Sequence, residues 1–128
     1  MLLNTMFTQN DIIETGMQAS LVRNDVILNN IANVDTPNFK KSNVKFENIL
    51  ADVLDHRKRQ GAGAKPELSR AVPVIEVQNA NFSHRLDGNN VNIETEMVDF
   101  YENSVRYDVM ASAVMNNYKK INMVLTTR

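Results

Sequence analysis

A run of apolar residues at heptad spacing near the C-terminal end constrains the fold of this chain more than any other feature. Between residues 97 and 125, positions separated by alternating steps of three and four are apolar apart from one serine. This spacing is typical of a helix that packs along one seam against another helix. The seam residues are Met97, Phe100, Ser104, Tyr107, Ala111, Val114, Tyr118, Ile121 and Leu125. The pattern predicts a long helix over residues 92–128, with Asn92 as its N-cap.

A second, weaker stripe predicts a helix from about Asn10 to Val34. Two of its seam positions are polar, and the others are apolar at the same helical spacing. The helix has to end before Pro37, because proline lacks an N–H and restricts Thr36 to extended conformations. The seam residues of this helix are Ile13, Met17, Ser20, Asn24, Ile27, Ile31 and Val34. Neither stripe is stable alone in water, so the two helices are natural partners.

The predicted fold class is therefore mainly α, with long N- and C-terminal helices pairing as an antiparallel coiled-coil hairpin. The irregular middle contains a short helix and leaves room for short β segments. We divide the chain into an N-terminal helix of the core domain (1–34), a connecting region (35–91) and a C-terminal helix of the core domain (92–128). Apolar surface also remains outside the seams, which favours contacts with neighbouring subunits. It comprises Leu21, Leu28, Tyr101 and Met115.

The first half of the connecting region predicts a short helix followed by a loop. Apolar residues at helical spacing between Phe46 and Leu54 indicate an amphipathic helix that the basic cluster at 56–59 closes. The glycines and the proline in residues 61–66 are typical of a flexible connection.

The second half predicts an extended segment and a turn. Residues 72–77 favour an extended conformation, and their proline suits an edge or a loop. Residues 87–90 predict a tight turn into the last helix. The sequence leaves open whether residues 60–85 pair as strands against a neighbour or stay loose.

Composition argues against an enzyme and against several classes of ligand. With 14 basic and 15 acidic residues the net charge is −1, so we expect no nucleic-acid partner. The absence of cysteine excludes disulfides, thiolate metal sites and cysteine nucleophiles. His56 and His84 are far apart, and the acidic residues after Asp87 lack the ligand spacing of a calcium-binding loop. We therefore expect no catalytic residue, no metal, no cofactor and no small-molecule substrate.

Two longer segments resemble signatures of the flagellar basal-body rod and hook protein family. Residues 29–40, Asn-Asn-Ile-Ala-Asn-Val-Asp-Thr-Pro-Asn-Phe-Lys, resemble the end of the first helix in that family. Residues 87–97, Asp-Gly-Asn-Asn-Val-Asn-Ile-Glu-Thr-Glu-Met, resemble the entry to its last helix. The short middle is most similar to that of the small proximal rod members. The matching motif positions are Asn30, Asn33, Asp35, Thr36, Pro37, Phe39, Asp87, Gly88, Asn90 and Glu96.

Two positions depart from the family pattern. Asn38 stands where the family usually has glycine, and asparagine is the next best residue for a left-handed conformation, so we expect the turn to survive. Phe39 replaces the usual tyrosine and loses its hydroxyl group.

The resemblance implies a structural subunit of the proximal rod, which transmits torque from the membrane ring to the distal rod and hook. The implied partners are copies of this chain, other rod proteins, and membrane-ring and export-gate or rod-adaptor proteins at the rod base. The implied location is the flagellar basal body in the cell envelope. Because the first residues lack a basic leader and a cleavage site, we expect export without a cleaved signal peptide.

The helix seams are the predicted assembly interface. Asn30 and Asn33 can be no more than a polar helix face, or they can form interfacial hydrogen bonds where the helix ends. An alternative function is a soluble helical adaptor or secretion chaperone that binds a partner helix, which solution size would distinguish. The interface residues are Ile13, Met17, Asn24, Ile27, Ile31, Met97, Phe100, Tyr107, Val114, Tyr118, Ile121 and Leu125.

Overall fold

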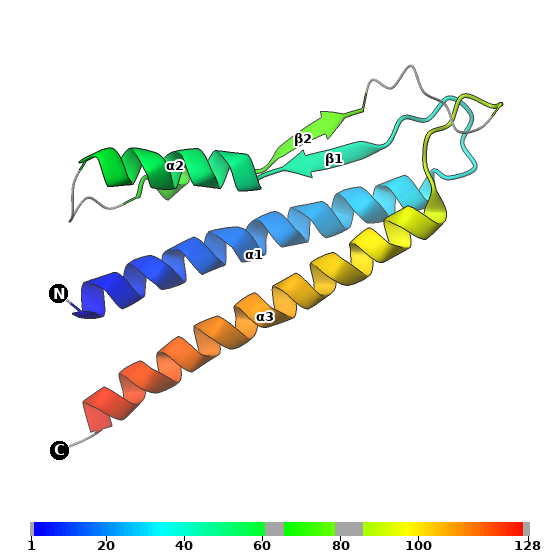
Figure 1. The fold of residues 1–128 in the computed structure, drawn as a ribbon. Coiled ribbons are helices and arrows are strands. Elements are labelled where there is room, and N and C mark those ends of the chain that lie inside the picture. The colour runs from blue at the N-terminus through cyan, green and yellow to red at the C-terminus, as the bar shows by residue number, and fades with distance from the viewer. Residues whose placement is uncertain (1, 61–65, 79–85, 127–128) are drawn as a thin grey trace.

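The computed structural model describes residues 2–60, 66–78 and 86–126. Its two long helices, α1 (Leu2–Ala32) and α3 (Ile93–Thr126), lie side by side and run in opposite directions (Figure 1). We call the end where α1 begins and α3 ends the terminal end, and the end where α1 ends and α3 begins the turn end. The prediction of a mainly α fold with a pair of long terminal helices is confirmed.

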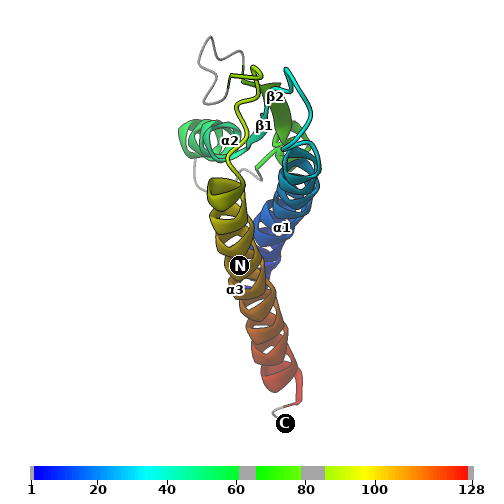
Figure 2. The ribbon, with the colours of Figure 1, turned by 90° about the vertical axis from the view of Figure 1, so that its right-hand side faces the viewer.

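The connecting region packs on a different side of α1 from α3. It contains a two-stranded antiparallel sheet of β1 (Ser42–Lys45) and β2 (Val74–Val77), the helix α2 (Glu47–Gln60) and a 3-10 turn, η1 (Leu68–Arg70). Seen from the turn end, Figure 2 shows α2 and the strands on one side of the helix pair. The helix α1 is therefore the central element, with α3 on one side and the sheet and α2 on another.

A small apolar core joins α1 to this second layer. Ala19, Phe46 and Ala71 are buried against one another, one each from α1, the residue before α2 and the residue after η1. The small side chain of Ala19 lets the aromatic ring approach the helix closely. Val44, Leu50 and Val53 are partly buried against this cluster.

The strand β1 was not predicted as such, because Ser-Asn-Val-Lys contains a single apolar residue. It pairs with β2 in the register Ser42 to Val77 and Val44 to Ile75, so the extended segment predicted around residues 72–77 has its partner within the same chain. The Gln78 N–H donates to the Lys41 carbonyl at 2.9 Å. In an antiparallel ladder the backbone N–H and C=O groups of successive residues point in opposite directions. Because the Lys41 carbonyl points toward β2, the N–H and C=O of Ser42 face α1.

Helix boundaries differ from the predictions in three places. The helix α1 begins at Leu2 and not near Asn10, and it ends at Ala32 and not at Val34. The helix α2 continues through the basic cluster at 56–59 instead of stopping there. The N-cap of α3 is as predicted, since Asn92 Oδ1 accepts the N–H of Glu94 at 2.9 Å. Most of the predicted flexible connection lies outside the described residues, and the division of the chain into three parts stays a prediction.

Two residues with positive φ shape the turn end. Asn38 has φ 60° and Gly88 has φ 79°, so the left-handed turn expected at Asn38 is confirmed. A Cβ atom at Gly88 would lie 2.5 Å from Asn38 Oδ1, at the end of a side chain that can move, so the positive φ is what favours glycine here. No helix in the described residues is long and apolar enough to cross a membrane.

Candidate assembly interface

Polar contacts at three levels hold α1 and α3 in an antiparallel register. Asn117 Nδ2 donates to Asn10 Oδ1 at 2.8 Å near the terminal end. Asn103 Nδ2 donates to Asn24 Oδ1 at 2.6 Å midway. The third level lies at the turn end, between Asn30 of α1 and the N-terminal turns of α3. As the residue number rises in α1, that of its partner in α3 falls, which defines a single register.

Close packing and incomplete hydrogen bonding coexist in this interface. A Cβ atom at Gly16 would lie 3.1 Å from Met110 Sδ, so α3 approaches α1 closely there. Within the described part of the chain, the buried atoms Asn10 Nδ2 and Asn103 Oδ1 have no hydrogen-bond partner. Each unsatisfied buried group costs about 1–3 kcal/mol, so the polar seam specifies register at the expense of stability.

In the predicted seam of α1, Ser20 and Ile27 are buried and the other residues are half-buried. The Ser20 carbonyl and Asn24 Oδ1 both accept hydrogen bonds from Asn103 of α3. The predicted seam of α3 has two columns, and the residues of one of them are at least half-buried. Phe100, Tyr107 and Val114 are half-buried and Ile121 is buried, as expected for residues that pack against α1. These four residues are seven positions apart, so they form one column along the helix.

The other predicted column of α3 is exposed at three of its five positions, while Ser104 and Ala111 are half-buried. Met97, Tyr118 and Leu125 are exposed, at 39%, 47% and 68%. The column that faces α1 lies one residue earlier and is more polar, and the hydrophobic pattern alone therefore missed it. It comprises Glu96, Asn103, Met110 and Asn117. Any role of the exposed column in assembly stays a prediction.

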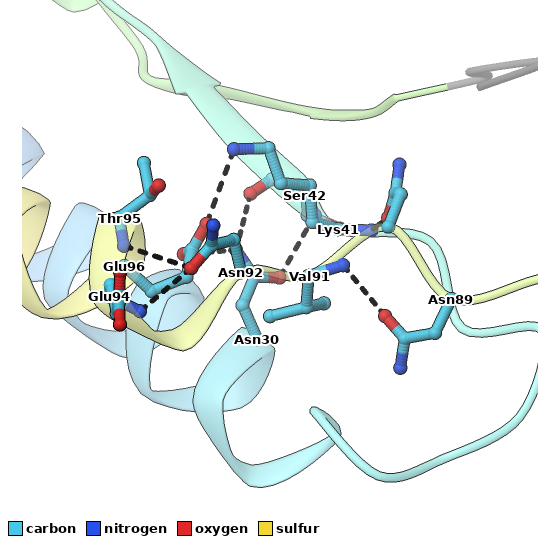
Figure 3. Close-up of polar contacts among 10 residues, drawn as sticks. Asn30, Lys41, Ser42, Asn89, Val91, Asn92, Glu94, Thr95 and Glu96 are labelled. Atoms are coloured by element: carbon cyan, nitrogen blue, oxygen red, sulfur yellow. Dashed lines mark hydrogen bonds and ion pairs between the residues drawn. The ribbon is translucent and has the colours of Figure 1, made fainter. Parts of the chain in front are cut away.

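Asn30 is the centre of a buried polar cluster at the turn end (Figure 3). Its side-chain amide donates to the Ser42 carbonyl at 2.9 Å and accepts the Ser42 N–H at 3.0 Å, as a neighbouring strand would. It also donates to Glu96 Oε2 at 2.9 Å, while Lys41 Nζ lies 3.3 Å from Glu96 Oε1. Asn30 and Glu96 are each 1% exposed. One amide thus joins α1, β1 and α3.

Asn89 closes the C-terminal end of α1 and is 0% exposed. Its Nδ2 donates to the carbonyls of Asn33, Val34 and Thr36 at 3.0, 2.9 and 2.9 Å. Its Oδ1 accepts the Val91 N–H at 2.7 Å. Carbonyls at a helix C-terminus have no partner in the helix, so this side chain satisfies them from a distant segment. Asn89 is not among the predicted motif positions, and its place inside the second motif is the only signal for it in the sequence.

The remaining motif residues surround these two asparagines. Asn90 Oδ1 accepts the Lys41 N–H at 2.7 Å, and the Asp87 carbonyl accepts the Asn38 N–H at 3.0 Å. Asn33 Oδ1 accepts the Thr36 hydroxyl at 3.2 Å. The other motif positions are exposed or half-buried at the turn, namely Asp35, Pro37, Phe39 and Gly88.

We expect Asn89→Asp to destabilise the fold by about 2–4 kcal/mol, because a carboxylate would replace the donor that faces three carbonyl oxygens. Asn89→Ala should cost less, since it removes the hydrogen bonds without adding charge. Urea unfolding followed by circular dichroism measures both. Equal stability of the aspartate variant and the parent chain would show that the observed hydrogen bonds do not support the turn end.

Two arginines form ion pairs with Glu47 and join the layers near the middle of the molecule. Arg23 Nη2 lies 2.6 Å from Glu47 Oε1, and Arg106 Nη1 lies 3.7 Å from the same oxygen. Burial raises the pKa of Glu47, but backbone hydrogen bonds at Glu47 and Phe46 and the Arg23 guanidinium together hold that pKa below its ordinary value. Arg23 and Arg106 also line a groove of about 440 Å³ between α3 and β1.

Two apolar surfaces remain exposed on the outer sides of the helix pair. The α1 outer face consists of Phe7, Leu21 and Leu28, which are 49%, 49% and 50% exposed and lie on one side of the helix. The α3 outer ridge is 56–65% exposed throughout and lies opposite the column that packs on α1. The ridge consists of Val98, Tyr101, Val105, Val109, Met115 and Met123.

The described residues contain no group of three histidine, cysteine, aspartate or glutamate side chains that could hold a metal ion. His56 is exposed on α2, and His84 lies outside the described residues. What the geometry supports is packing and hydrogen bonding between long helices.

Comparison with known proteins agrees with this geometry. A family model described as "Flagella basal body rod protein" matches residues 11–40, which include most of α1 and the turn that follows it. The flagellar basal body rod protein FlgB of Borreliella burgdorferi is 30% identical over 117 residues, covering 81% of this chain and 85% of the relative.

Other relatives of the same name align over similar lengths. The FlgB protein of Bacillus subtilis is 28% identical over 122 residues, covering 89% of this chain and 90% of its own length. That of Escherichia coli is 29% identical over 114 residues, covering 80% and 82%. The similarity therefore extends well beyond the first motif and includes most of both chains.

Proposed function

The chain belongs to the flagellar basal body rod protein family, and on this premise we propose that it is a structural subunit of the proximal rod, where it transmits torque from the membrane ring to the distal rod and hook. The observation that carries the proposal is the 30% identity to a FlgB protein across 85% of that relative's length. Its relatives are named as rod proteins, so the chain is a structural protein and not an enzyme.

The helix pair suits a part that has to resist twisting. Close-packed interfaces deform little, and the three-level polar register between α1 and α3 opposes sliding of one helix along the other. The α1 outer face and the α3 outer ridge leave apolar surface that further subunits would bury. These features support assembly into a stiff polymer.

We further propose the finer partners and location. Besides copies of itself and other rod proteins, the subunit would contact membrane-ring and export-gate or rod-adaptor proteins at the rod base. It would reach the cell envelope through the flagellum's own export apparatus. The adaptor or secretion chaperone considered above is not favoured, because the relatives of this chain are rod proteins.

We propose that the helix pair is incompletely folded before assembly, with its terminal end frayed and its turn end held by Asn30 and Asn89. The unsatisfied atoms in the seam and the exposed apolar surfaces support this view. Circular dichroism of the purified monomer should show less helix than two complete terminal helices would give. Complete helices that melt in one cooperative transition would contradict coupled folding.

The function itself is tested by complementation. In a motile strain that lacks its own FlgB protein, this chain should restore swimming and should copurify with detergent-extracted basal bodies. A matched strain carrying the empty vector should stay immotile. Recovery of the chain only as a soluble heterodimer, with no basal-body fraction, would favour the adaptor and would overturn the rod assignment.

A further inference from the structure

We propose that the carboxylate of Glu76 keeps the open edge of β2 from pairing with β2 of a second copy. This role goes beyond the proposed function, because it concerns the free chain before any assembly. An edge strand without protection is a template for another strand, and natural proteins commonly place a charge there. Glu76 is the only charged residue of β2.

The sheet has one covered edge and one open edge. On the covered side the backbone groups of Ser42 face α1, where the Asn30 amide bonds both of them. The strand β2 lies on the side of β1 that faces away from α1 (Figure 1), and among the described elements only β1 packs extensively against it. All four residues of β2 are exposed. The open edge of the sheet is therefore the outer side of β2.

Two residues of β2 present unpaired backbone groups at this edge. The Gln78 N–H donates to the Lys41 carbonyl, so the backbone of Gln78 points toward β1. Because the direction alternates along a strand, the N–H and C=O groups of Ile75 and Val77 point away from β1. Within the described part of the chain, these groups have no hydrogen-bond partner. The edge is also apolar, since Val74, Ile75 and Val77 are each more than half exposed.

A second copy of β2 fits this edge in one fully bonded antiparallel register. In that register Ile75 of each copy lies opposite Val77 of the other, and every free N–H and C=O group of the two edges is paired. A shift of one residue turns the free groups away from each other. A shift of two residues brings Val77 opposite Pro73, which has no N–H, or sets Ile75 beyond the end of the other strand.

The fully bonded register sets Glu76 directly opposite Glu76 of the second copy. The Cβ atoms of such a pair are about 4.5–5.5 Å apart, and like charges at that spacing are destabilising. Lys45 binds Glu76 from the β1 side, so the two lysines would lie outside the two carboxylates. Each lysine is then farther from the opposite carboxylate than the carboxylates are from each other, and a net repulsion remains. The flanking residues on this face, Val74 and Gln78, are uncharged.

Without this charge, residues 72–77 would form an apolar segment typical of strands that self-associate. The run Val-Pro-Val-Ile-Glu-Val has a β-branched residue at every position except Pro73 and Glu76. Pro73 protects only the start of the strand, because it lacks a backbone donor. Glu76 is therefore the residue of this segment whose replacement should change self-association most.

Replacement of Glu76 in the purified chain tests this role. Glu76→Val should raise the self-association constant, measured by sedimentation equilibrium, about tenfold or more, because a repulsive cross-strand pair becomes an attractive one. Glu76→Gln, which removes the charge and keeps the shape, should raise it about threefold. The matched control is Glu67→Val, since Glu67 is exposed, forms an ion pair with Arg70 and lies outside the sheet.

Amide hydrogen exchange locates the new contact. At a concentration where the Glu76→Val chain is mostly associated, the N–H groups of Ile75 and Val77 should exchange about tenfold more slowly than in the parent chain. Glu76→Lys separates the repulsion from the loss of the ion pair with Lys45, because it breaks that ion pair but again sets like charges opposite each other. This variant should stay unassociated through β2.

Three results would overturn the proposal. One is that Glu76→Val and Glu76→Gln both associate no more than Glu67→Val. Another is slow exchange of Ile75 and Val77 in the parent chain at the same concentration, since the edge would then be paired despite the charge. The third is association of Glu76→Lys through Ile75 and Val77, which would assign the effect to the lost ion pair. None of these results bears on motility, so the rod function is tested separately.

Discussion

An Asn30→Ala variant is expected to lose about 3–5 kcal/mol of folding free energy, although the substitution removes only one small polar side chain. Asn30 is 1% exposed and makes hydrogen bonds to both backbone groups of Ser42 and to Glu96. Its removal leaves an N–H and a C=O without partners and a buried carboxylate with only Lys41 nearby. Because these groups are buried, water cannot fully replace the lost hydrogen bonds.

The measurement is urea unfolding of the purified chain, with amide hydrogen exchange at Ser42 as a local readout. Exchange of the Ser42 N–H should accelerate more than that of amides at the terminal end. The matched control is Asn29→Ala, the exposed neighbour, whose loss should change stability by less than about 0.5 kcal/mol. If the two alanine variants are equally stable, the polar cluster does not hold the turn end together.

Aspartate at a half-buried position of either predicted helix seam is expected to abolish rod formation and motility. Ile31 and Val114 are both half-buried and belong to the seam columns of α1 and α3. Ile31→Asp or Val114→Asp would place a charge between the helices and should cost about 3 kcal/mol, from lost burial and from desolvation of the carboxylate. A loss of folding free energy of this size is expected to separate a helix pair that is only marginally stable.

Swimming in soft agar and electron microscopy of basal bodies measure the effect. Asn116→Asp is the control, because Asn116 is exposed on the same helix and the new charge remains in water. Cells carrying the control should swim. A motile strain carrying Ile31→Asp or Val114→Asp would refute the placement of these residues in a required helix contact.

Local patterns predicted the elements more reliably than their contacts. Heptad spacing located both long helices, and the proline after Thr36 located the end of the first, because both signals depend on neighbouring residues only. The N-cap at Asn92 and the left-handed conformation at Asn38 were predictable for the same reason. The strand β1 was not, since its partner lies about thirty residues away and its own sequence is mostly polar.

The seam of α3 shows where a hydrophobic pattern misleads. The apolar column that begins at Met97 has the right spacing, yet the polar column that begins at Glu96 faces α1. The asparagines of α1 are complementary to Glu96, Asn103 and Asn117, and this complementarity can be recognised only when both helices are considered together. Met97, Tyr118 and Leu125 of the displaced apolar column are therefore exposed.

Spacing, capping residues and two motifs predict the two long helices, the turn between them and the family. The three-dimensional fold was needed to learn which faces of the helices meet, that Asn30 and Asn89 are buried, and which apolar residues stay exposed. The physical reason is that periodicity and capping are local, whereas the hydrogen bonds of a buried amide depend on segments that the fold brings together from distant positions.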